Sequence, residues 1–485
     1  MQSFPVSPSK LPITLFSTVL VVGAATGCSE VPSTEGGETT GDATSDGNGD
    51  GDPSGDGDGD ATGDGDGEPQ ALGPTYWQDV APIFYERCVT CHQDSGIGPF
   101  SLDGYEASVA LASVAVEAVV DRSMPPWFVT TDGSCNEWQD STALSDEQID
   151  TIVAWVEAGT PEGEPRDDLE VPVPESIGPA LSATTPEIVP EAAGDLLTMN
   201  DEYRCFVLDP GIEQDGFVTA SSVEPGNPAL VHHVLGVIVD PDEVNDEGLT
   251  NLEAITALDA ESPDRPGWPC LTLFGEGLEP KAIPIVWAPG QGVTELPEGT
   301  GVAVEAGDLM VAQIHYNLYD PNLDGQSDST TLNLRVVDEV ERVGVYNIHL
   351  GLISTFFQGE PHIIPPGEEA YEYTFDIPLA GYLNALGEGA QLWGYFPHAH
   401  ERGVSMSARI VDSEGQEKAC VAEVPRWDYD WQLYYFMQEP ITFEQGDRLE
   451  MTCIYDTSED AQPTIPGWGT QDEMCFMGLY LSEGP

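Results

Sequence analysis

From about Ile188 to the C-terminus, short runs of apolar and β-branched residues alternate with turn residues. Pro-Gly, Glu-Gly and Asp-Gly pairs separate these runs, and long helical stripes are missing. Such runs are typical of strands in antiparallel β-sandwiches. The strands that this pattern predicts include Leu230–Val239, Leu309–Leu318, Thr331–Val337, Val343–Leu352, Tyr371–Ile377, Arg448–Tyr455 and Cys475–Leu481. About 300 residues are too many for one such sandwich, so we expect two that divide near Asp338–Val343.

Residues 76–165 show the apolar pattern of helices. The buried face of a first helix is predicted to carry Trp77, Val80, Ala81 and Phe84. Ser145-Asp146-Glu147-Gln148 forms a capping box that opens another helix. That helix has an apolar stripe and is predicted to end at a Gly and a Pro: Ile149, Ile152, Val153, Val156, Gly159 and Pro161. The chain is therefore predicted to be mainly β. Two tandem, jelly-roll-like antiparallel β-sandwiches, residues 190–340 and 341–485, follow a small all-α domain at residues 71–165.

The N-terminus has the pattern of an export signal. Lys10 is the only charge in residues 1–28, and an apolar run from Leu11 leads to Ala25-Thr26-Gly27-Cys28. The run is short for a membrane span, and small residues precede the cysteine. It resembles a bacterial lipoprotein signal, in which Cys28 is acylated. A plain signal peptide is the alternative, because Ala25 stands where leucine is usual. We expect an exported protein that is lipid-anchored to the cell envelope, where disulfides persist.

Two other stretches are predicted to be linkers. Residues 29–70 are mainly Gly, Asp, Thr and Ser, so they cannot bury enough surface to offset the entropy of ordering and should form a disordered tether. Residues 166–189 are rich in Pro, Glu and Asp. The chain holds 14 Lys and Arg against 86 Asp and Glu, which excludes nucleic acid and anionic membrane surfaces as partners. A lipid anchor is therefore the only membrane attachment that we expect.

Cys88-Val89-Thr90-Cys91-His92 is a specific motif in the helical region. Two thiols at this spacing can form thioether bonds to haem, and the next histidine can ligate the iron. A redox dithiol and half of a zinc site are the alternatives. A zinc site needs another close Cys/His pair, and the next histidine is His232. Met124, between a serine and two prolines, is expected to be the sixth iron ligand. The helices and loops together resemble a small c-type cytochrome domain with one covalent haem c.

Five histidines and a methionine stand in strand-like parts of the β region. Residues two apart on a strand point to the same side, so His398 and His400 can reach one metal ion. Adjacent residues point to opposite sides, so the strand that carries His232 and His233 must bulge if both share a metal. A third imidazole, that of His315, stands in a later strand.

The donor types indicate which metal is expected. Three imidazoles suit copper, zinc or iron, whereas two imidazoles with the thioether of Met474 favour copper. Each of these motifs alone would fit core packing, but their joint presence predicts a copper protein.

The order His-His, His-Tyr, His-x-His and Asp-Glu-Met-Cys resembles that of the copper type II, ascorbate-dependent monooxygenases, which include the peptidylglycine α-hydroxylating and dopamine β-monooxygenase enzymes. The stretch Asp201-Glu202-Tyr203-Arg204-Cys205 also resembles the first cysteine segment of this family. The resemblance implies two sandwiches that face each other across a solvent-filled cleft. It also implies an electron-transfer copper on His232, His233 and His315, and a copper that binds O2 and substrate on His398, His400 and Met474.

The resemblance implies disulfides as well. Cys453 and Cys475 match a family bridge beside the methionine ligand, and Cys205 and Cys270 flank the His-His motif and are expected to form another. If Cys28 is acylated and the two thiols of the haem motif are used, Cys135 and Cys420 remain. They either pair as an interdomain bridge or stay free, and the count of cysteines leaves both options open.

Two positions depart from the peptidylglycine enzyme. Phe396 stands where that enzyme has an arginine that binds the substrate carboxylate, and Gly478 replaces a tyrosine that assists it. The pocket is therefore less suited to an anionic peptide terminus. His349 and His362 match no family ligand, and we expect them to be packed or surface residues.

The sequence thus predicts a copper-dependent monooxygenase that hydroxylates a C–H bond of a small molecule with O2. In the family, ascorbate usually supplies electrons one at a time. A fused cytochrome domain carries single electrons, so we expect it to relay them from a one-electron donor to the coppers, in place of ascorbate or between ascorbate and copper. The alternatives are an electron-transfer or copper-binding lipoprotein without hydroxylase activity, and a structural β-sandwich protein.

Overall fold

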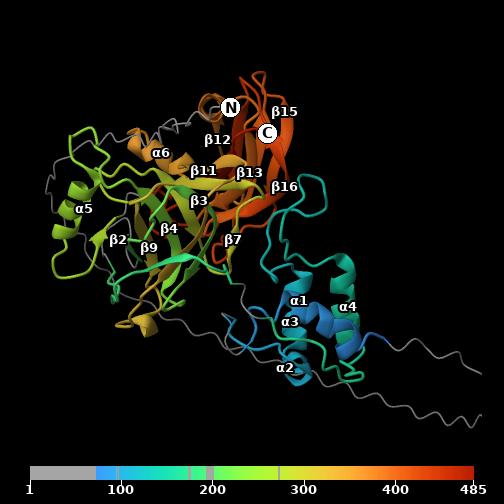
Figure 1. Cartoon of the computed structure of the whole chain (residues 1–485). Helices are drawn as coiled ribbons and strands as arrows, with labels where there is room; N and C mark the ends of the chain where they lie inside the picture. The colour runs from blue at the N-terminus through green and yellow to red at the C-terminus, as the bar shows by residue number, and fades with distance from the viewer. Residues whose placement is uncertain (1–72, 94–95, 97, 173–175, 193–200, 271–273) are drawn as a thin grey trace, which may run out of the picture. The chain divides into compact units, whose positions relative to one another are not determined.

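The computed structural model describes residues 73–485 apart from 94–95, 97, 173–175, 193–200 and 271–273 (Figure 1). The predicted export signal, Cys28 and the predicted tether lie outside the described residues. None of the helices in the described ranges is long and apolar enough to cross a membrane.

The N-terminal part of the described chain is helical and has its own core. Its elements are a π-helix at Tyr76–Val80, α1 (Ala81–Arg87), α2 (Tyr105–Ala110), α3 (Ala112–Val120) and α4 (Asp146–Glu157). The predicted capping box is present at the start of α4, where Ser145 and Gln148 each bind the other's backbone N–H. Trp77 was predicted to be buried, but Tyr76 is the buried residue, because the wider turn of a π-helix shifts the face that it buries.

The rest of the described chain forms three sheets (Figure 1). A nine-stranded sheet has the order β1-β10-β3-β8-β11-β18-β13-β16, with β7 paired to β3. A five-stranded sheet has the order β5-β2-β9-β4-β6, and a four-stranded sheet the order β12-β17-β14-β15. The bounds are β1 (Leu181–Thr184), β2 (Asp201–Leu208), β3 (Gly216–Glu224), β4 (Val231–Val239), β5 (Trp268–Pro269), β6 (Ala282–Trp287), β7 (Thr294–Glu295), β8 (Thr300–Val304), β9 (Leu309–Asn317), β10 (Thr331–Val337), β11 (Arg342–His349), β12 (Tyr371–Pro378), β13 (Gln391–His398), β14 (Gly403–Val411), β15 (Glu417–Val424), β16 (Tyr435–Thr442), β17 (Arg448–Tyr455) and β18 (Phe476–Ser482).

One pair of strands joins the two halves of the β region within a single sheet. β8 and β11 run in parallel, with Arg342 opposite Thr300 and Gly344 opposite Val302. The expectation of purely antiparallel sandwiches is wrong at this point. The chain between the two strands passes through β9 in another sheet and then through β10, and this supplies the long crossover that parallel pairing needs.

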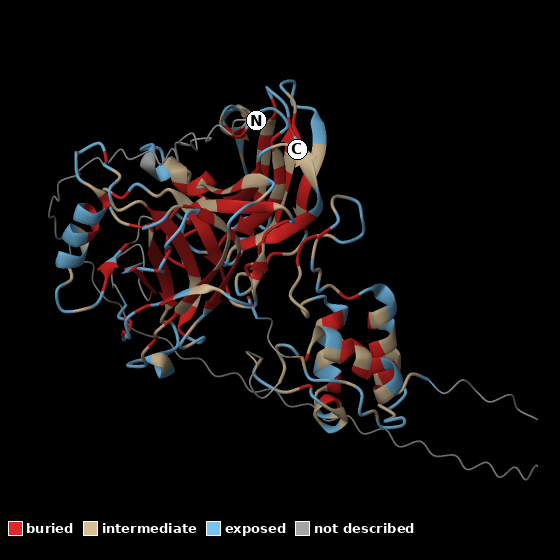
Figure 2. Ribbon diagram, viewed as in Figure 1, coloured by how far each residue is buried: buried red, intermediate tan, exposed pale blue. Residues whose placement is uncertain are grey.

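Two large cores lie between the sheets. The first contains residues of the five-stranded sheet, such as Val234 and Ile314, together with residues of the nine-stranded sheet such as Leu332. The second core includes Tyr395 of β13 and Leu449 of β17, so the four-stranded sheet packs on the C-terminal part of the nine-stranded one. Figure 2 shows that buried residues follow the strands, whereas much of α5 is exposed.

Three short α-helices and one 3-10 helix in the described β region were not predicted: α5 (Asn251–Ala260), α6 (Gly351–Phe357), α7 (Ala380–Leu386) and the 3-10 helix Pro321–Leu323. The predicted strand Val343–Leu352 ends earlier, at His349, and α6 follows it. Gly351 makes this change possible, because a Cβ there would lie 1.9 Å from the carbonyl oxygen of Cys475. The short length of these helices gives too few turns for an apolar stripe to be recognised.

Three disulfides join the described parts: Cys135–Cys420, Cys205–Cys270 and Cys453–Cys475. They coincide with the pairs expected from the resemblance and from the count of cysteines. Of the two options for Cys135 and Cys420, the structure contains the bridge, which ties the chain that follows α3 to β15.

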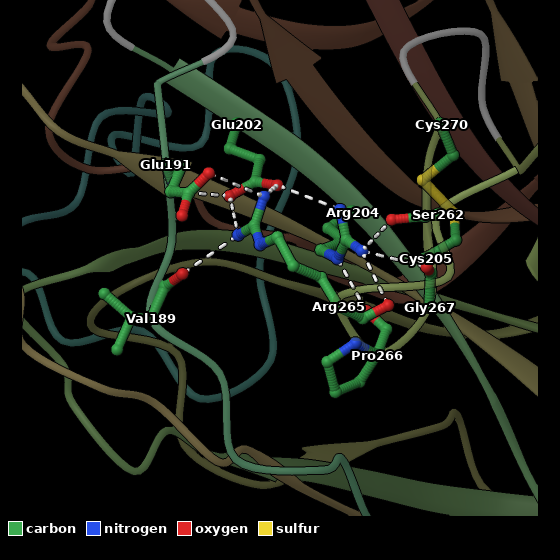
Figure 3. A network of polar contacts seen from close by, with 10 residues as sticks. All are labelled: Val189, Glu191, Glu202, Arg204, Cys205, Ser262, Arg265, Pro266, Gly267 and Cys270. Atoms are coloured by element: carbon green, nitrogen blue, oxygen red, sulfur yellow. Dashed lines mark hydrogen bonds and ion pairs between the residues drawn. A yellow bond between two sulfur atoms is a disulfide. The ribbon is translucent and has the colours of Figure 1, made fainter.

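A buried ionic network joins β2 to the loop that precedes β5 (Figure 3). The guanidinium of Arg204 is 1% exposed and donates to the carbonyl oxygens of Pro266 and Gly267. It also pairs with Glu202, whose carboxylate accepts two further hydrogen bonds from Arg265. Charges and donors are therefore matched within the network, as burial requires.

We expect Arg204→Met to lower the free energy of unfolding by about 3–5 kcal/mol, because it removes one of the two guanidinium partners of the buried Glu202 carboxylate and leaves the carbonyl oxygens of Pro266 and Gly267 without this donor. Arg409→Met is the matched control. Arg409 is 41% exposed and pairs with Glu423 at the surface, so its loss should cost less than about 1 kcal/mol. Urea unfolding of both variants measures the difference, and equal costs would contradict the assignment of the network as a stabilising element.

Candidate metal centres

Three histidines converge on the five-stranded sheet, and we call them the first histidine set: His232, His233 and His315. β4 carries the first two and β9 the third, and His233 lies directly opposite His315 in the pairing of these strands. The register shifts between Val231 and His233, so β4 has the irregularity that adjacent histidines need in order to face one point. Nδ1 of His233 lies 3.3 Å from Nδ1 of His232 and 3.2 Å from Nδ1 of His315.

These distances fit a metal ion better than they fit hydrogen bonds. A neutral imidazole carries one N–H, so Nδ1 of His233 can satisfy at most one of its two neighbours. A tetrahedral ion with bonds of about 2.0 Å places its nitrogens about 3.3 Å apart. Burial lowers the pKa of His232 and of His233 well below the usual value, which keeps these imidazoles in the neutral form that ligation needs.

The environment of the first histidine set comes mainly from β2. The ring of Tyr203 stacks on that of His315 with centroids 4.1 Å apart. Nε2 of His315 is buried without a hydrogen-bond partner among the described residues, and Oδ1 of Asp201 lies 3.7 Å from it. Asp201 also accepts a hydrogen bond of 3.0 Å from the hydroxyl of Thr470, which belongs to the C-terminal half.

The second ligand set lies at the end of β13 and just before β18: His398, His400 and Met474. The rings of the two histidines are 5.3 Å apart. Nδ1 of His398 lies 2.7 Å from the side-chain oxygen of Gln432, and Nδ1 of His400 lies 3.1 Å from the carbonyl oxygen of Asp472. Because each Nδ1–H donates to an oxygen, each Nε2 is left as the nitrogen that can bind a metal.

Met474 is buried at 2% exposure and is held through its backbone. Its N–H donates to the carboxylate of Glu473, and its carbonyl oxygen accepts a 2.7 Å hydrogen bond from the hydroxyl of Tyr455. The next residue, Cys475, is fixed by a disulfide. Burial raises the pKa of Glu473 to about 8.

The two ligand sets are in contact. The rings of His233 and His398 are 6.4 Å apart, and Tyr429 stacks on His232 while its ring lies 5.9 Å from that of His400. The resemblance implied a solvent-filled cleft between the sets, and this expectation is wrong for the structure. The loop between β15 and β16 fills the space, with Trp431 of this loop packed closely against the backbone of the N-terminal half.

Comparison with known proteins agrees with this site. Residues 348–482 match the family described as copper type II ascorbate-dependent monooxygenase, C-terminal domain. The matched region contains the second ligand set, together with β13 and β18.

The chain is also similar to two beta-hydroxylases and to a DBH-like monooxygenase protein. Tyramine beta-hydroxylase of Caenorhabditis briggsae is 25% identical over 266 residues, which are 53% of this chain and 40% of that protein. Dopamine beta-hydroxylase of Canis lupus familiaris is 26% identical over 199 residues, 40% of this chain and 31% of that protein. DBH-like monooxygenase protein 1 of Mus musculus is 27% identical over 174 residues, which are 35% of this chain and 27% of that protein. Each match spans less than half of the relative.

The haem motif lies in the helical part. Cys88 and Cys91 form no disulfide, and burial raises the pKa of the Cys88 thiol to about 12. Nδ1 of His92 lies 3.2 Å from the carbonyl oxygen of Phe100, which leaves Nε2 free to bind iron. In the described part of the chain, no hydrogen bond or ring contact joins Met124 to this motif.

Several residues at the site were not singled out from the sequence. Glu473 and Asp201 stand inside quoted motifs, so proximity to the expected ligands was a signal. Gln432 and Tyr429 come from a loop that matches no motif, and only its aromatic content distinguishes it. His349 and His362 were expected to be ordinary packed residues, and each has a ring nitrogen within hydrogen-bond distance of a tyrosine hydroxyl: Tyr382 at 2.5 Å and Tyr371 at 2.7 Å.

We expect Gln432→Leu to weaken copper binding at the second ligand set by about 10- to 100-fold, since the acceptor that orients His398 is lost. Binding at the first histidine set should not change. Competition with a chelator measures both affinities, and Gln416→Leu, at an exposed turn, is the control. Equal affinity in the variant and the parent would show that Gln432 does not orient the ligand.

Proposed function

We propose that this protein is a copper-dependent monooxygenase that hydroxylates a C–H bond of a small organic molecule. The ring contact between two ligand sets of different chemistry carries the proposal, together with the match of the second set's region to a monooxygenase domain. In the net reaction, R–H, O2, two electrons and two protons give R–OH and water. Bound copper supplies the one-electron redox chemistry that this reaction needs.

The two ligand sets differ in their donor atoms, and this difference assigns a separate role to each copper. The three imidazoles of the first histidine set would hold the copper that transfers an electron. The second ligand set would hold the copper at which O2 and substrate meet, because a thioether with two imidazoles favours Cu(I). Gln432 and the Asp472 carbonyl hold the imidazoles of the second set in place. His400 and His315 are each 2% exposed, whereas His232 and His233 are half-buried, so water is excluded from only part of the two sets.

The wall beside His398 supports an uncharged, apolar substrate. Phe396 lies opposite Gly478 in the pairing of β13 with β18. A Cβ on Gly478 would lie 3.1 Å from Cβ of Phe396, so the glycine provides the room that this aromatic residue needs. The Phe396 ring stacks between those of His398 and Tyr434. This wall offers aromatic surface where the peptidylglycine enzyme offers an arginine.

We also propose that a haem in the helical domain passes single electrons to the coppers. The segment that follows Met124 is fastened to the C-terminal half, which supports the relay. Phe128 N–H donates to the hydroxyl of Tyr435, Trp138 forms a β-bridge with Met437, and Cys135 is joined to Cys420. β16, which carries Tyr435, pairs with β13, the strand of His398. These contacts therefore connect the segment after Met124 to the nine-stranded sheet, which contains His398.

The three disulfides fit an exported protein, since such bonds persist outside the cytoplasm. Attachment to the cell envelope through an acylated Cys28 is part of the proposal. A copper-binding or electron-transfer protein without hydroxylase activity is the second candidate, and it differs in predicting no oxygen uptake that depends on a substrate.

The copper-loaded protein is expected to hold two coppers and, with ascorbate supplied as the electron donor, to show O2 uptake that depends on a substrate, at higher rates for uncharged aromatic compounds than for carboxylate-bearing ones. Met474→Ile should abolish this uptake and weaken one copper, because it removes the thioether. Met451→Ile, a buried core substitution on β17, is the control and should keep both properties. Metal analysis and an oxygen electrode give the readouts. Two bound coppers without any substrate-dependent uptake across the series would favour the second candidate.

Replacing Cys88 and Cys91 with Ala removes haem attachment, and we expect it to slow copper reduction by physiological one-electron donors at least tenfold. Loss of the Cu(II) signal in electron paramagnetic resonance measures reduction directly. A small chemical reductant should reduce the coppers of the variant and the parent equally, which controls for damage to the copper sites. Unchanged reduction by the donors would refute the relay.

A further inference from the structure

One buried carboxylate beside the second ligand set has no part in the function described so far. Glu473 is 0% exposed, and it stands next to Met474 in the sequence. Its Oε2 accepts hydrogen bonds from the backbone N–H groups of His400, at 3.0 Å, and Met474, at 2.9 Å. Its Oε1 accepts a third from the N–H of Arg402, at 3.0 Å. A single side chain thus binds the backbone on both sides of the ligand set.

The Glu473 carboxylate lies just beyond the point where the pairing of β13 with β18 ends. β13 and β18 pair in register as far as His398 opposite Phe476. The same register continued by two residues would bring His400 opposite Met474, but the strand pairing has already ended there. The Glu473 carboxylate bridges the N–H groups of these two residues, so it takes over the role of the missing ladder hydrogen bonds.

Glu473 is itself held firmly. Its N–H donates to the carbonyl oxygen of Ile465, and its carbonyl oxygen accepts from the N–H of Gly467. Arg402 is fixed by an ion pair with Asp460 and by a hydrogen bond to the carbonyl oxygen of Gln471. Both ends of the bridge are therefore anchored. The carboxylate thus holds the segments that contain His400 and Met474 at a defined spacing.

We infer that Glu473 is a positioning residue that sets the spacing of His400 and Met474 and thereby builds the thioether-containing copper site. The inference rests on the proposed function, in that the second ligand set must hold copper. A carboxyl group suits this role because its two oxygens can accept all three hydrogen bonds, and all three of its partners are backbone N–H donors. A glutamine at this position would turn an NH2 group toward at least one N–H, so one bond of the bridge would be lost.

The test compares Glu473→Gln and Glu473→Asp with Asp447→Asn in the full chain. Asp447 is a matched control because it is also a buried carboxylate of the C-terminal half, accepting from the N–H of Glu444 and the ammonium of Lys418. It contacts neither ligand set in the described structure. Chelator competition gives the affinity of each copper, X-ray absorption of the reduced protein reports the copper–sulfur bond, and thermal unfolding of the copper-free form reports stability.

We expect Glu473→Gln to weaken the copper of the second ligand set by about 10- to 100-fold and to reduce the sulfur signal, with the first histidine set unchanged. Glu473→Asp keeps the charge but is one methylene shorter, so its loss should be intermediate. Asp447→Asn should lower the unfolding temperature and leave both coppers and the sulfur signal intact.

Three results would overturn the inference. The first is an unchanged affinity and sulfur signal in Glu473→Gln, and the second is an equal loss of both coppers. The third is failure of both Glu473 variants to fold without copper while Asp447→Asn folds, because the role would then be structural. A parent protein that binds no copper at the second ligand set would instead refute the proposed function, so the two failures are distinguishable.

Discussion

The parallel pairing of β8 with β11 is the contact on which the relation between the two ligand sets depends. Through it the nine-stranded sheet contains strands from both halves of the chain. β13, with His398, belongs to this sheet, whereas β4 and β9, with the first histidine set, belong to the sheet that shares a core with it. Backbone hydrogen bonds fix the spacing of strands within a sheet. The two sets can therefore separate only if the sheets slide on their common core or the loop with Tyr429 and Trp431 withdraws.

Burial acts on the two kinds of ionisable group at the site in opposite directions. It lowers the pKa of His398 to about 4 and raises that of Asp472 to about 6 and that of Glu473 to about 8. In both cases the neutral form gains, because a dry environment disfavours charge. Neutral imidazoles are the form that binds a metal, while a bound cation would favour ionised carboxylates next to it. A metal bound at these ligands and the buried acids would therefore stabilise one another's charge.

Local features of the sequence predicted local structure well. Thr331–Val337 and Arg448–Tyr455 are strands with the predicted bounds. The requirement that β4 bulge at its adjacent histidines followed from the two-residue period of a strand, and the structure has that register shift. These features depend on neighbouring residues, so the sequence around them is sufficient.

Features that depend on distant segments were not predictable in the same way. Gln432 reaches His398 only because the loop between β15 and β16 folds back over the site, and nothing in the residues near position 432 indicates this. The contact between the two ligand sets was missed for the same reason, since it is set by the crossover into β11 and by packing of Trp431 on the N-terminal half. Two of the cysteine pairs were implied by the family resemblance, whereas the sequence left open whether Cys135 and Cys420 pair or stay free.

The two departures from the peptidylglycine enzyme, Phe396 and Gly478, are sterically coupled. Phe396 and Gly478 are cross-strand neighbours, so the large side chain on β13 is accommodated by the missing one on β18. Either change alone would leave a gap or a clash beside His398, and both are costly in a packed core. The pair changes the wall of the site while the positions of His398, His400 and Met474 stay fixed by the sheet, by Gln432 and by Glu473. Phe396 and Gly478 are not members of the second ligand set, so the wall beside His398 can change while its metal donors stay the same.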